Sequence, residues 1–251
     1  MRNNKVIYTC LVGEYDILRQ PRFIYENFDY ICFSNDIPVS CIGVWKIQKI
    51  PYKHPDKTRV SRYVKINPHT VLYSYKYSLW IDANVEIVNK DLQNRIEELI
   101  ELNSKIAQVQ HIERDCIYDE ITECFKCSKD NVLLLYKQYK FLRKEGYPAH
   151  YGLFENNIIY RQHNDSLVVK ISEEWWKMYM KFSKRDQLSL CYIYRKLDFA
   201  PDLLLPERIN TRNCRGLKLY NHPPISAGKR IILRLKRICK VLLLYVLRRC
   251  L

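Results

Sequence analysis

The segment Tyr77-Ser78-Leu79-Trp80-Ile81-Asp82-Ala83-Asn84 is a short apolar run that ends on a carboxylate. An apolar run of this length, followed by polar residues, predicts a buried β-strand over Tyr77–Ile81. Asp82 and Asn84 are two positions apart, so both side chains can face one cleft where the strand ends. Oxygen ligands of this kind suit Mg²⁺ or Mn²⁺, which bridge a protein carboxylate to substrate phosphates, although Asn84 is a weaker, neutral ligand. The alternative is that Asp82 only caps a turn.

Similar apolar runs lie on both sides of this segment, and helical patterns alternate with them. Further strands are predicted at Lys5–Val12, Tyr30–Phe33, Val44–Ile47, Ile106–Val109 and Asn157–Tyr160. Helices are predicted at Asp91–Asn103, from Asn131 to Glu145 with Gly146 as the stop, from Ser172 as N-cap to Phe182, and from Arg185 to Leu197. Strands that alternate with helices predict an α/β fold whose sheet has substantial parallel content.

The composition is that of a folded, basic protein. Of 251 residues, 42 are Lys or Arg and 27 are Asp or Glu, which gives a net charge of +15, and aromatic residues make up 13%. The basic excess predicts an anionic partner: a nucleotide phosphate, lipid headgroups or nucleic acid. The absence of G-x-G-x-x-G, G-x-x-x-x-G-K-[ST] and G-x-S-x-G motifs argues against a dinucleotide fold, a Walker phosphate loop and an α/β-hydrolase.

The ten cysteines are expected to be reduced, because the residues from Met1 onward contain no signal-peptide hydrophobic region. Cys124 and Cys127 form a lone C-x-x-C without a second pair nearby. We therefore interpret most cysteines as small core residues rather than as zinc or redox ligands. The sequence also contains no run of about 18 apolar residues, the length that predicts a membrane span.

The last residues carry much of the positive charge. Between Lys229 and Arg249 there are eight basic residues and no acidic one, and apolar residues recur at helical spacing. This pattern is typical of a helix lying in the plane of an anionic membrane surface. The alternative is a helix packed on the domain or on a partner. The chain is thus divided into a domain over residues 1–227 and a basic amphipathic tail over 228–251.

A basic helix face and several polar clusters are the other candidates for chemistry. Arg59, Arg62 and Lys65 are three residues apart, so on a helix they share a face that could neutralise a diphosphate leaving group. The alternative is an ordinary solvated face. Glu155 and Asn156 precede a predicted strand and could bind acceptor hydroxyls, while Asp186 could either cap a helix or face a reacting sugar. A polar cluster also follows the predicted strand at Ile106–Val109, from His111 to Glu120.

Together these segments resemble a family of glycosyltransferase-like proteins, long catalogued as a domain of unknown function, found in bacterial surface-polysaccharide loci and among plant Golgi proteins. The resemblance covers about residues 5–222 and rests on five segments in order: Arg59-x-x-Arg62-x-x-Lys65-x-x-x-His69, Tyr77–Asp82, His111-x-x-Arg114-Asp115-Cys116, Gly152-Leu153 leading to Ile159-x-Arg161-x-His163, and Ser183-x-Arg185-Asp186-Gln187-Leu188-Ser189. It implies a single GT-A domain, which is Rossmann-like with a mixed, mostly parallel central sheet, and transfer of a sugar from a nucleotide-sugar donor.

The resemblance also implies roles for individual residues. The residues expected at the nucleotide-sugar site are Thr9, Gly13, Tyr15, Asp36, Arg59, Arg62, Lys65, Asp82, Asn84 and His111. Within this set the three basic residues of the helix face would hold the diphosphate. Asp186 and Gln187 would lie beside the transferring sugar, with Glu155 as a further catalytic residue. Candidate bases are Asp186, Glu155 and Asp119. Mn²⁺ or Mg²⁺ would be held by Asp82, Asn84 and His222.

The function expected from the sequence is therefore transfer of a sugar from a nucleotide-sugar donor, expected to be UDP-linked, to a glycan or lipid-linked acceptor in surface polysaccharide synthesis. The enzyme would act in the cytoplasm, held on the inner face of the cell membrane by its tail. Two alternatives stay open: a nucleic-acid-binding protein that uses its basic surface, and a membrane-associated hydrolase or noncatalytic glycan-binding relative. The clustering of charge in an apolar tail argues against a nucleic-acid partner.

Overall fold

The computed structural model describes residues 3–13 and 15–222, and the tail predicted at 228–251 lies outside this part of the chain. The strands are β1 (Lys5–Cys10), β2 (Phe28–Phe33), β3 (Cys41–Ile42), β4 (Trp45–Gln48), β5 (Tyr77–Ile81), β6 (Val85–Ile87), β7 (Ile106–Gln110), β8 (Phe154–Arg161), β9 (Asp202–Leu203) and β10 (Leu217–Leu219). The helices are α1 (Lys57–Ile66), α2 (Pro68–Val71), α3 (Asp91–Glu101), α4 (Ile117–Lys126), α5 (Val132–Lys144), α6 (Ser166–Lys181) and α7 (Gln187–Lys196).

Eight strands form one mixed, mostly parallel sheet in the order β3-β4-β2-β1-β5-β8-β7-β9, which confirms the predicted fold class. β1, β2, β4 and β5 run parallel, whereas β8 is antiparallel to both of its neighbours, β5 and β7. A second sheet pairs β6 with β10. The carboxyl ends of β1, β2 and β5 thus meet at one edge, where open α/β sheets bind their ligands.

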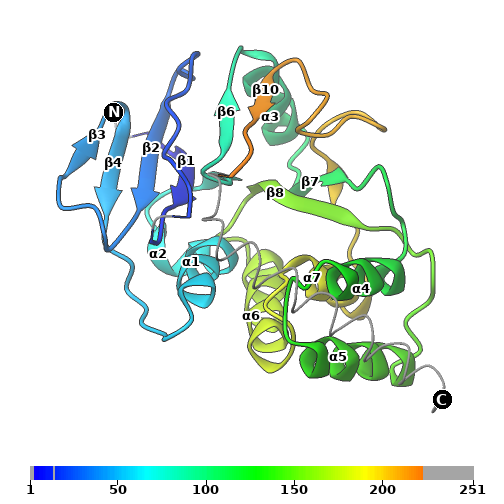
Figure 1. The fold of residues 1–251 in the computed structure, drawn as a ribbon. Coiled ribbons are helices and arrows are strands. Elements are labelled where there is room, and N and C mark those ends of the chain that lie inside the picture. Colours follow the sequence, from blue (N-terminus) through cyan, green and yellow to red (C-terminus); the bar gives the residue numbers. More distant parts are fainter. Residues whose placement is uncertain (1–2, 14, 223–251) are drawn as a thin grey trace.

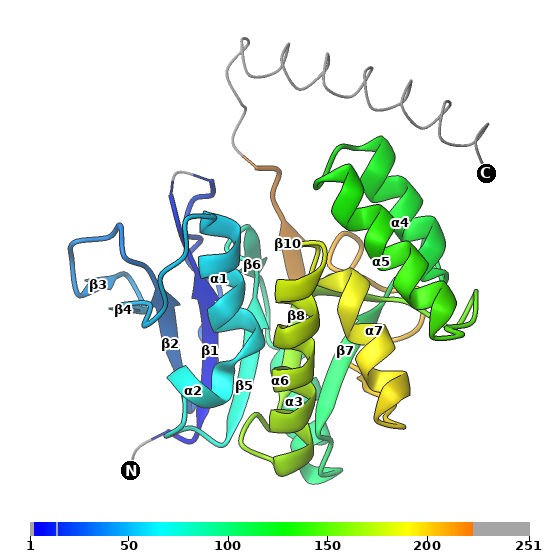
Figure 2. The same cartoon turned by 90° about the horizontal axis from the view of Figure 1, so that it is seen from below.

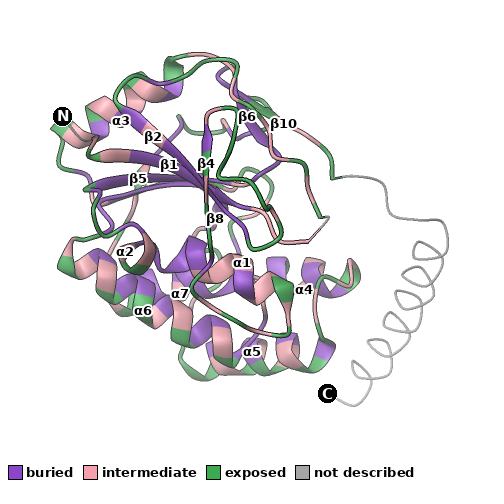
Figure 3. Cartoon of the chain, turned by 90° about the vertical axis from the view of Figure 1, so that its left-hand side faces the viewer, coloured by how far each residue is buried: buried purple, intermediate pink, exposed green. Residues whose placement is uncertain are grey.

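The sheet is the middle layer of the molecule (Figures 1 and 2). Helices α1, α2 and α4–α7 cover one face, and α3 with the small β6–β10 sheet covers the other (Figure 3). Alternation along the strands explains this, because successive side chains point to opposite faces. Trp80 packs with the helices of the larger layer, whereas its neighbours Leu79 and Ile81 pack with α3. Both faces are covered, so β5 is buried along its whole length.

The predicted elements are largely present, and three differences have clear local causes. Helix α6 begins at Ser166 rather than after Ser172, because the Asp165 side chain accepts hydrogen bonds from the backbone amides of Leu167 and Val168. Ser172 is buried inside the helix. Strand β8 starts before the predicted Asn157, so it includes Glu155 and Asn156. Most of the second half of the polar cluster at 111–120 forms the start of helix α4.

None of the helices in the described part of the chain is long and apolar enough to cross a membrane. The eight cysteines placed within this part are all free, and five of them are buried. This agrees with their interpretation as core residues. The small sheet formed by β6 and β10 was not predicted, because three-residue strands carry too little periodicity to be recognised.

Candidate active site

A polar pocket of about 390 Å³ opens beside the end of β5. Its residues come from α1, α4, β8, the start of α7 and the loops that follow β5 and β7. They are Arg62, Lys65, Asp82, His111, Glu113, Arg114, Glu120, Glu123, Cys124, Cys127, Lys129, Glu155, Asn156, Asn157, Arg185, Asp186, Gln187 and Arg212. Segments far apart in the sequence therefore contribute side chains to a single pocket at the end of β5, where Asp82 lies.

The centre of the pocket is a buried carboxylate surrounded by cations. The Lys65 ammonium lies 2.6 Å from Oδ2 of Asp186, and Nε of Arg62 lies 3.2 Å from the same oxygen. Burial alone would raise the pKa of Asp186, but the charges of Lys65, Arg62 and Arg185 hold that pKa well below its usual range. Burial lowers the pKa of Lys65, and the neighbouring carboxylates Asp186 and Asp82 oppose this. Asp186 is therefore an anion at neutral pH.

Helix α1 presents Arg62 and Lys65 to this carboxylate because its three-residue spacing places them on one face. The helix is anchored at both ends. Asp56 caps its N-terminus and also accepts a 2.9 Å hydrogen bond from Lys184. At the other end, the buried Arg161 guanidinium donates to the carbonyl of Lys65 at 2.7 Å and to the Tyr8 hydroxyl at 2.5 Å. A cation at a helix C-terminus is favourable against the helix dipole.

Arg59, the third residue of the predicted basic face, has a different position. Its guanidinium donates to the carbonyls of Tyr179 and Phe182 at the end of α6, at 2.8 and 3.3 Å. It stands over the Tyr179 ring, and it is absent from the residues that line the pocket. Arg59 thus connects α1 to the end of α6.

Asp82 ends β5 at the mouth of the pocket, where its Oδ1 accepts a 2.8 Å hydrogen bond from the Trp80 indole. The Lys65 ammonium lies 3.5 Å from the same oxygen, so Oδ2 is the oxygen left for a ligand. Asn84 is buried and donates to the carbonyl of Tyr220 at 2.8 Å. In return, the Tyr220 amide donates to the carbonyl of Asn84 at 2.9 Å. This exchange brings the segment that carries His222 alongside the end of β5.

His222 lies in a group with Asp16 and Tyr15. Its Nδ1 lies 2.8 Å from Oδ1 of Asp16, and its ring stands 4.6 Å from the Tyr15 ring. Burial raises the pKa of Asp16, and among the smaller contributions His222 lowers it while the charge of Asp82 raises it. Asp16, Asp82 and His222 do not form one group of ligand atoms within 4.8 Å. These donors would suit a divalent cation only if substrate phosphates completed its shell, which is the usual manner of Mg²⁺.

The other residues predicted at the nucleotide lie at the ends of β1 and β2. The Gly13 amide donates to Asp36 at 2.5 Å, and both lie outside the pocket lining. Gly13 has φ of +69°, a backbone conformation that glycine adopts without strain. Thr9 is fully buried in β1, and its hydroxyl has no hydrogen-bond partner. Tyr15 is two-thirds exposed.

An irregularity in β8 turns Glu155 and Asn156 into the pocket. Gln108 on β7 pairs with Ile159, but the next residue, Val109, pairs with Glu155, so the extra residues of β8 bulge. Glu155 is buried, and its Oε1 accepts from Asn210 at 2.9 Å and from Arg212 at 3.0 Å. Asn156 accepts from Gln108 at 2.8 Å through its carbonyl, and its amide nitrogen is buried without a partner.

The wall formed by α4 was only partly predicted. His111 lines the pocket, and its Nδ1 accepts from the amides of Glu113 and Arg114 at 3.3 and 3.1 Å. Burial lowers its pKa. Arg114 donates to the buried Glu120 at 2.7 Å. Asp119 is exposed and lies outside the lining, so the structure does not bring this candidate base to the pocket.

Several pocket residues, including Arg185, Glu120 and Arg212, had no assigned role in the sequence analysis. Asp16, which contacts His222 outside the pocket lining, had none either. Arg185 and Glu120 belong to motifs quoted for the resemblance or to the cluster beside them, so a signal for them existed. Arg212 and Asp16 stand in irregular segments without periodicity, and only the folded chain brings them to the site. The buried Nε of Arg185 has no hydrogen-bond partner. The amide nitrogen of Asn156 also has none, so both donors are available to a polar group in the pocket.

Comparison with solved structures returns glycosyltransferases of low identity. The apo structure of the WbbM bifunctional glycosyltransferase is 11% identical over 80% of this chain and has a TM-score of 0.42. This chain spans only 38% of the length of WbbM. Core-mannan synthase A (CmsA/Ktr4) from Aspergillus fumigatus, in its Mn/GDP form, is 10% identical over 76% of this chain and 69% of its own, with a TM-score of 0.43. Mouse xyloside xylosyltransferase 1, in its apo form, is 8% identical over 76% of this chain and 79% of its own, with a TM-score of 0.39.

No protein of curated function matches the chain in sequence. A family model does match it: the model described as TOD1/MUCI70, glycosyltransferase-like domain, over residues 34–213. The matched region runs from the end of β2 to the loop before β10 and contains Lys65, Asp82, Glu155 and Asp186. It therefore includes the central cation cluster and every residue that lines the pocket. The chain belongs to the TOD1/MUCI70 glycosyltransferase-like domain family.

Proposed function

We propose that this protein is a glycosyltransferase that moves a sugar from a nucleotide-sugar donor, UDP-linked in the first instance, to a glycan or lipid-linked acceptor. One observation carries the proposal. Lys65, Arg62 and Arg185 surround Asp186 in a polar pocket at the carboxyl end of β5. A diphosphate leaving group needs preorganised positive charge where its own charge develops, and a partly buried cluster supplies this more strongly than solvent-exposed side chains do.

Different residues would serve the donor diphosphate and the acceptor. Lys65 and Arg62 bind the diphosphate, and the anion of Asp186 fixes both cations before the donor arrives. The bond between the sugar and the phosphate oxygen breaks, and its electron pair goes to the diphosphate. The acceptor oxygen forms the new bond, and its proton passes to a carboxylate, for which Glu155 is the candidate. Asp186 is a poor base because three cations lower its pKa.

A divalent cation, Mn²⁺ or Mg²⁺, belongs to the same proposal. When bound, it would neutralise the charge of the diphosphate. Oδ2 of Asp82 and the free ring nitrogen of His222 would be protein ligands. The side-chain nitrogen of Asn84 donates a hydrogen bond to the carbonyl of Tyr220, so the side-chain oxygen would be the ligand atom of Asn84. Tyr15 and Asp36, near the ends of β1 and β2, would contact the nucleoside. The ring of Tyr15 offers an exposed aromatic face for a base.

The acceptor and the cellular site are proposed from the charge of the sequence. The eight basic residues between Lys229 and Arg249 would hold the protein on the anionic inner face of the cell membrane. A membrane-bound enzyme can reach a lipid-linked acceptor, which suits the synthesis of a surface polysaccharide such as capsule or lipopolysaccharide.

The first experiment measures the melting temperature of the full chain with UDP, GDP, CDP and ADP, each with and without Mn²⁺. A ligand that binds only the folded state adds roughly 2.7 kcal/mol at a hundredfold excess over its dissociation constant. We expect one nucleotide, UDP, to raise the melting temperature, and Mn²⁺ to enlarge the shift. A duplex DNA arm tests the nucleic-acid alternative under the same conditions.

Two variants connect this shift to the cation cluster. Lys65→Met removes the ammonium that contacts both Asp186 and Asp82, and Lys170→Met removes an exposed lysine on α6 as the matched control. We expect the first variant to lose the nucleotide shift and the second to retain it. The proposal is wrong if no nucleotide shifts the wild type, or if folded Lys65→Met binds as the wild type does. Asp82→Asn, at a partly exposed position, serves as the second test if Lys65→Met does not fold.

A further inference from the structure

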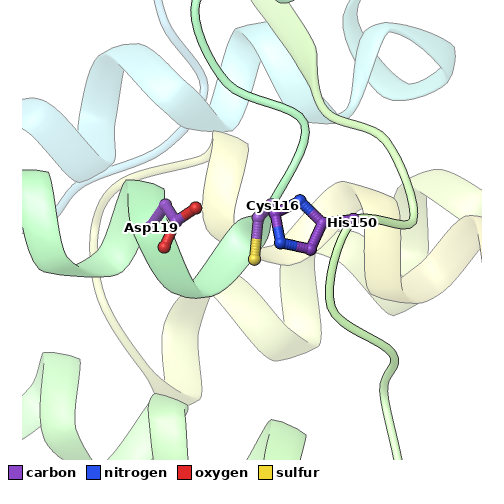
Figure 4. A group of neighbouring side chains, drawn as sticks. All are labelled: Cys116, Asp119 and His150. Atoms are coloured by element: carbon purple, nitrogen blue, oxygen red, sulfur yellow. The ribbon is translucent and has the colours of Figure 1, made fainter.

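Cys116, Asp119 and His150 meet outside the pocket in an arrangement that the proposed transfer does not use. One ligand atom from each residue lies within 4.8 Å of the other two, and none of the three lines the pocket. Among the residues that the structure describes, this is the one such group of His, Cys, Asp or Glu side chains. Figure 4 shows a ring nitrogen of His150 beside the sulfur of Cys116, with the Asp119 carboxylate facing them from the first turn of α4.

The orientation of His150 is fixed by a neighbouring carboxylate. Its Nδ1 lies 2.8 Å from Oδ1 of Asp115, so Nε2 is the nitrogen left for a ligand. Metal-binding histidines commonly donate their second ring nitrogen to a carboxylate in this way, which sets the tautomer and the ring plane. His150 has φ of +54°, an uncommon conformation for a residue other than glycine.

The sulfur and the second carboxylate come from the start of one helix. Cys116 is the N-cap of α4, and Asp119 lies in its first turn. A helix N-terminus favours negatively charged groups, such as the Asp119 carboxylate and the thiolate that a metal-bound Cys116 would be. Cys116 is buried whereas Asp119 and His150 are exposed, so the group is walled by protein on one side and open to solvent on the other.

We propose that Cys116, Asp119 and His150 bind one Zn²⁺, with water as the fourth ligand and Asp115 as the orienting partner of His150. One sulfur, one imidazole nitrogen and one carboxylate oxygen form a donor set that zinc accepts in tetrahedral geometry, whereas Mg²⁺ requires oxygen ligands. The metal joins the start of α4 to the segment that leads into β8. The Gly152 amide already ties the two at 2.9 Å by donating to the carbonyl of Asp115. Zinc would thus stabilise the position of α4, which lines the pocket, without contacting a ligand in the pocket.

The experiment uses Co²⁺ as a spectroscopic probe on the full chain after removal of metal with a chelator. A cobalt–thiolate bond gives a charge-transfer absorption in the near ultraviolet, which oxygen and nitrogen ligands alone do not give. We expect one equivalent of Co²⁺ to produce this band and one equivalent of Zn²⁺ to abolish it. A metal at Asp82 would produce no such band, so this result is independent of the proposed transferase site.

Three variants assign the band. Cys116→Ser should remove it, and His150→Ala should weaken Co²⁺ binding at least tenfold. Cys41→Ser, which removes an exposed cysteine of β3, should leave both unchanged. His150 is exposed, so its variant is expected to fold even if Cys116→Ser does not. The proposal is overturned if Co²⁺ binds without the band, if the band survives in folded Cys116→Ser, or if His150→Ala binds Co²⁺ as the wild type does.

Discussion

Asp186 shows how one buried carboxylate can hold the side chains of a site in place. Lys65 and Arg62 both contact its Oδ2, while Oδ1 accepts from the amide of Gln187 at the start of α7. The carboxylate therefore connects the helix that carries the cations to the helix that closes the pocket. Removing one partner of a buried ion pair leaves the other charge buried and uncompensated. The free-energy cost of this unpaired charge is larger than the net stabilisation that the intact pair provides.

We therefore predict that Asp186→Asn lowers both stability and transfer. The substitution leaves the buried Lys65 ammonium with one distant carboxylate, so the free energy of unfolding should fall by about 3–5 kcal/mol. Urea unfolding measures the change in stability. Donor turnover, assayed at a temperature where the variant is folded, measures the change in transfer activity. Asp198→Asn, an exposed substitution after α7, is the control and should match the wild type. A folded Asp186→Asn with normal turnover would remove Asp186 from the site.

His163 makes stability depend on pH. It is fully buried after β8, its Nε2 lies 2.9 Å from the carbonyl of Leu72, and burial lowers its pKa to about 4. An unfolded histidine titrates near pH 6.5, so between these values the unfolded chain binds the extra proton. Stability is therefore full above about pH 6.5 and declines as the pH falls toward 4. Between pH 7.5 and pH 5 this residue should cost about 2 kcal/mol.

His163→Gln tests this assignment, because glutamine keeps a hydrogen-bond donor and does not titrate. The variant should start less stable at pH 7.5 and then lose about 2 kcal/mol less than the wild type on acidification to pH 5. Urea unfolding at a series of pH values gives both numbers. Identical pH profiles for the two proteins would assign the acid sensitivity to other groups.

At this scale, the sequence predicted residue types better than contacts. Periodicity placed Arg59, Arg62 and Lys65 on one helix face, and that is correct. It could not predict that Arg59 contacts carbonyls at the end of α6, because that contact joins residues about 120 positions apart. The partners of Asp186 were similarly hidden, since a carboxylate at the start of a helix has the same local sequence pattern whether it only caps the helix or also pairs with a distant lysine.

Among the secondary-structure elements, helix α1 shows how interactions at a helix end contribute to stability. Asp56 caps the helix by accepting from the Thr58 amide at 2.9 Å, and it also pairs with Lys184 at 2.9 Å. Both members of that pair are about one-third exposed, so the ion pair itself should contribute little. The N-cap hydrogen bond should contribute more to stability than the ion pair does, because it satisfies a backbone amide that has no partner within the helix.

This reasoning predicts different results for two substitutions at one position. Asp56→Asn keeps a good capping side chain and removes the charge, so the free energy of unfolding should change by at most a few tenths of a kcal/mol. Asp56→Ala removes both and should cost about 1 kcal/mol. Urea unfolding of the two proteins side by side is the measurement. Equal losses in both would show that the contact with Lys184, rather than the cap, holds the start of α1.

The elements that sequence analysis found are those with strong local signals, such as the continuous apolar run of β5 and the stripe of α3. The antiparallel direction of β8 had no such signal, because an apolar run reads the same in either direction. Its bulge was also unpredictable, since it arises from the pairing with β7 rather than from any residue of β8. That bulge is what turns Glu155 and Asn156 into the pocket, so a central part of the site depended on tertiary structure.

For the whole molecule, the alternation of strands and helices was enough to predict an α/β sheet with substantial parallel content. The distribution of charge is a separate, global property. Eight of the basic residues lie between Lys229 and Arg249, where there is no acidic residue. Each basic residue close to an anionic bilayer contributes about 1 kcal/mol, and this attraction decays within about one Debye length. The predicted membrane attachment should therefore depend on lipid charge and on salt.

Sedimentation with vesicles tests this attachment. We predict that the full chain binds vesicles rich in anionic lipid and not neutral ones, and that binding weakens as salt rises from about 0.1 to 1 M, where the Debye length shrinks to about 3 Å. Deletion of residues 228–251 should abolish binding, whereas substitution of Lys53 and Lys57, which belong to a basic cluster before and in α1, should not. If the shortened protein sediments with anionic vesicles as the full chain does, the attachment belongs to the domain. Binding of the full chain that is unchanged in 1 M salt would instead indicate insertion of apolar side chains, because screening leaves hydrophobic contacts intact.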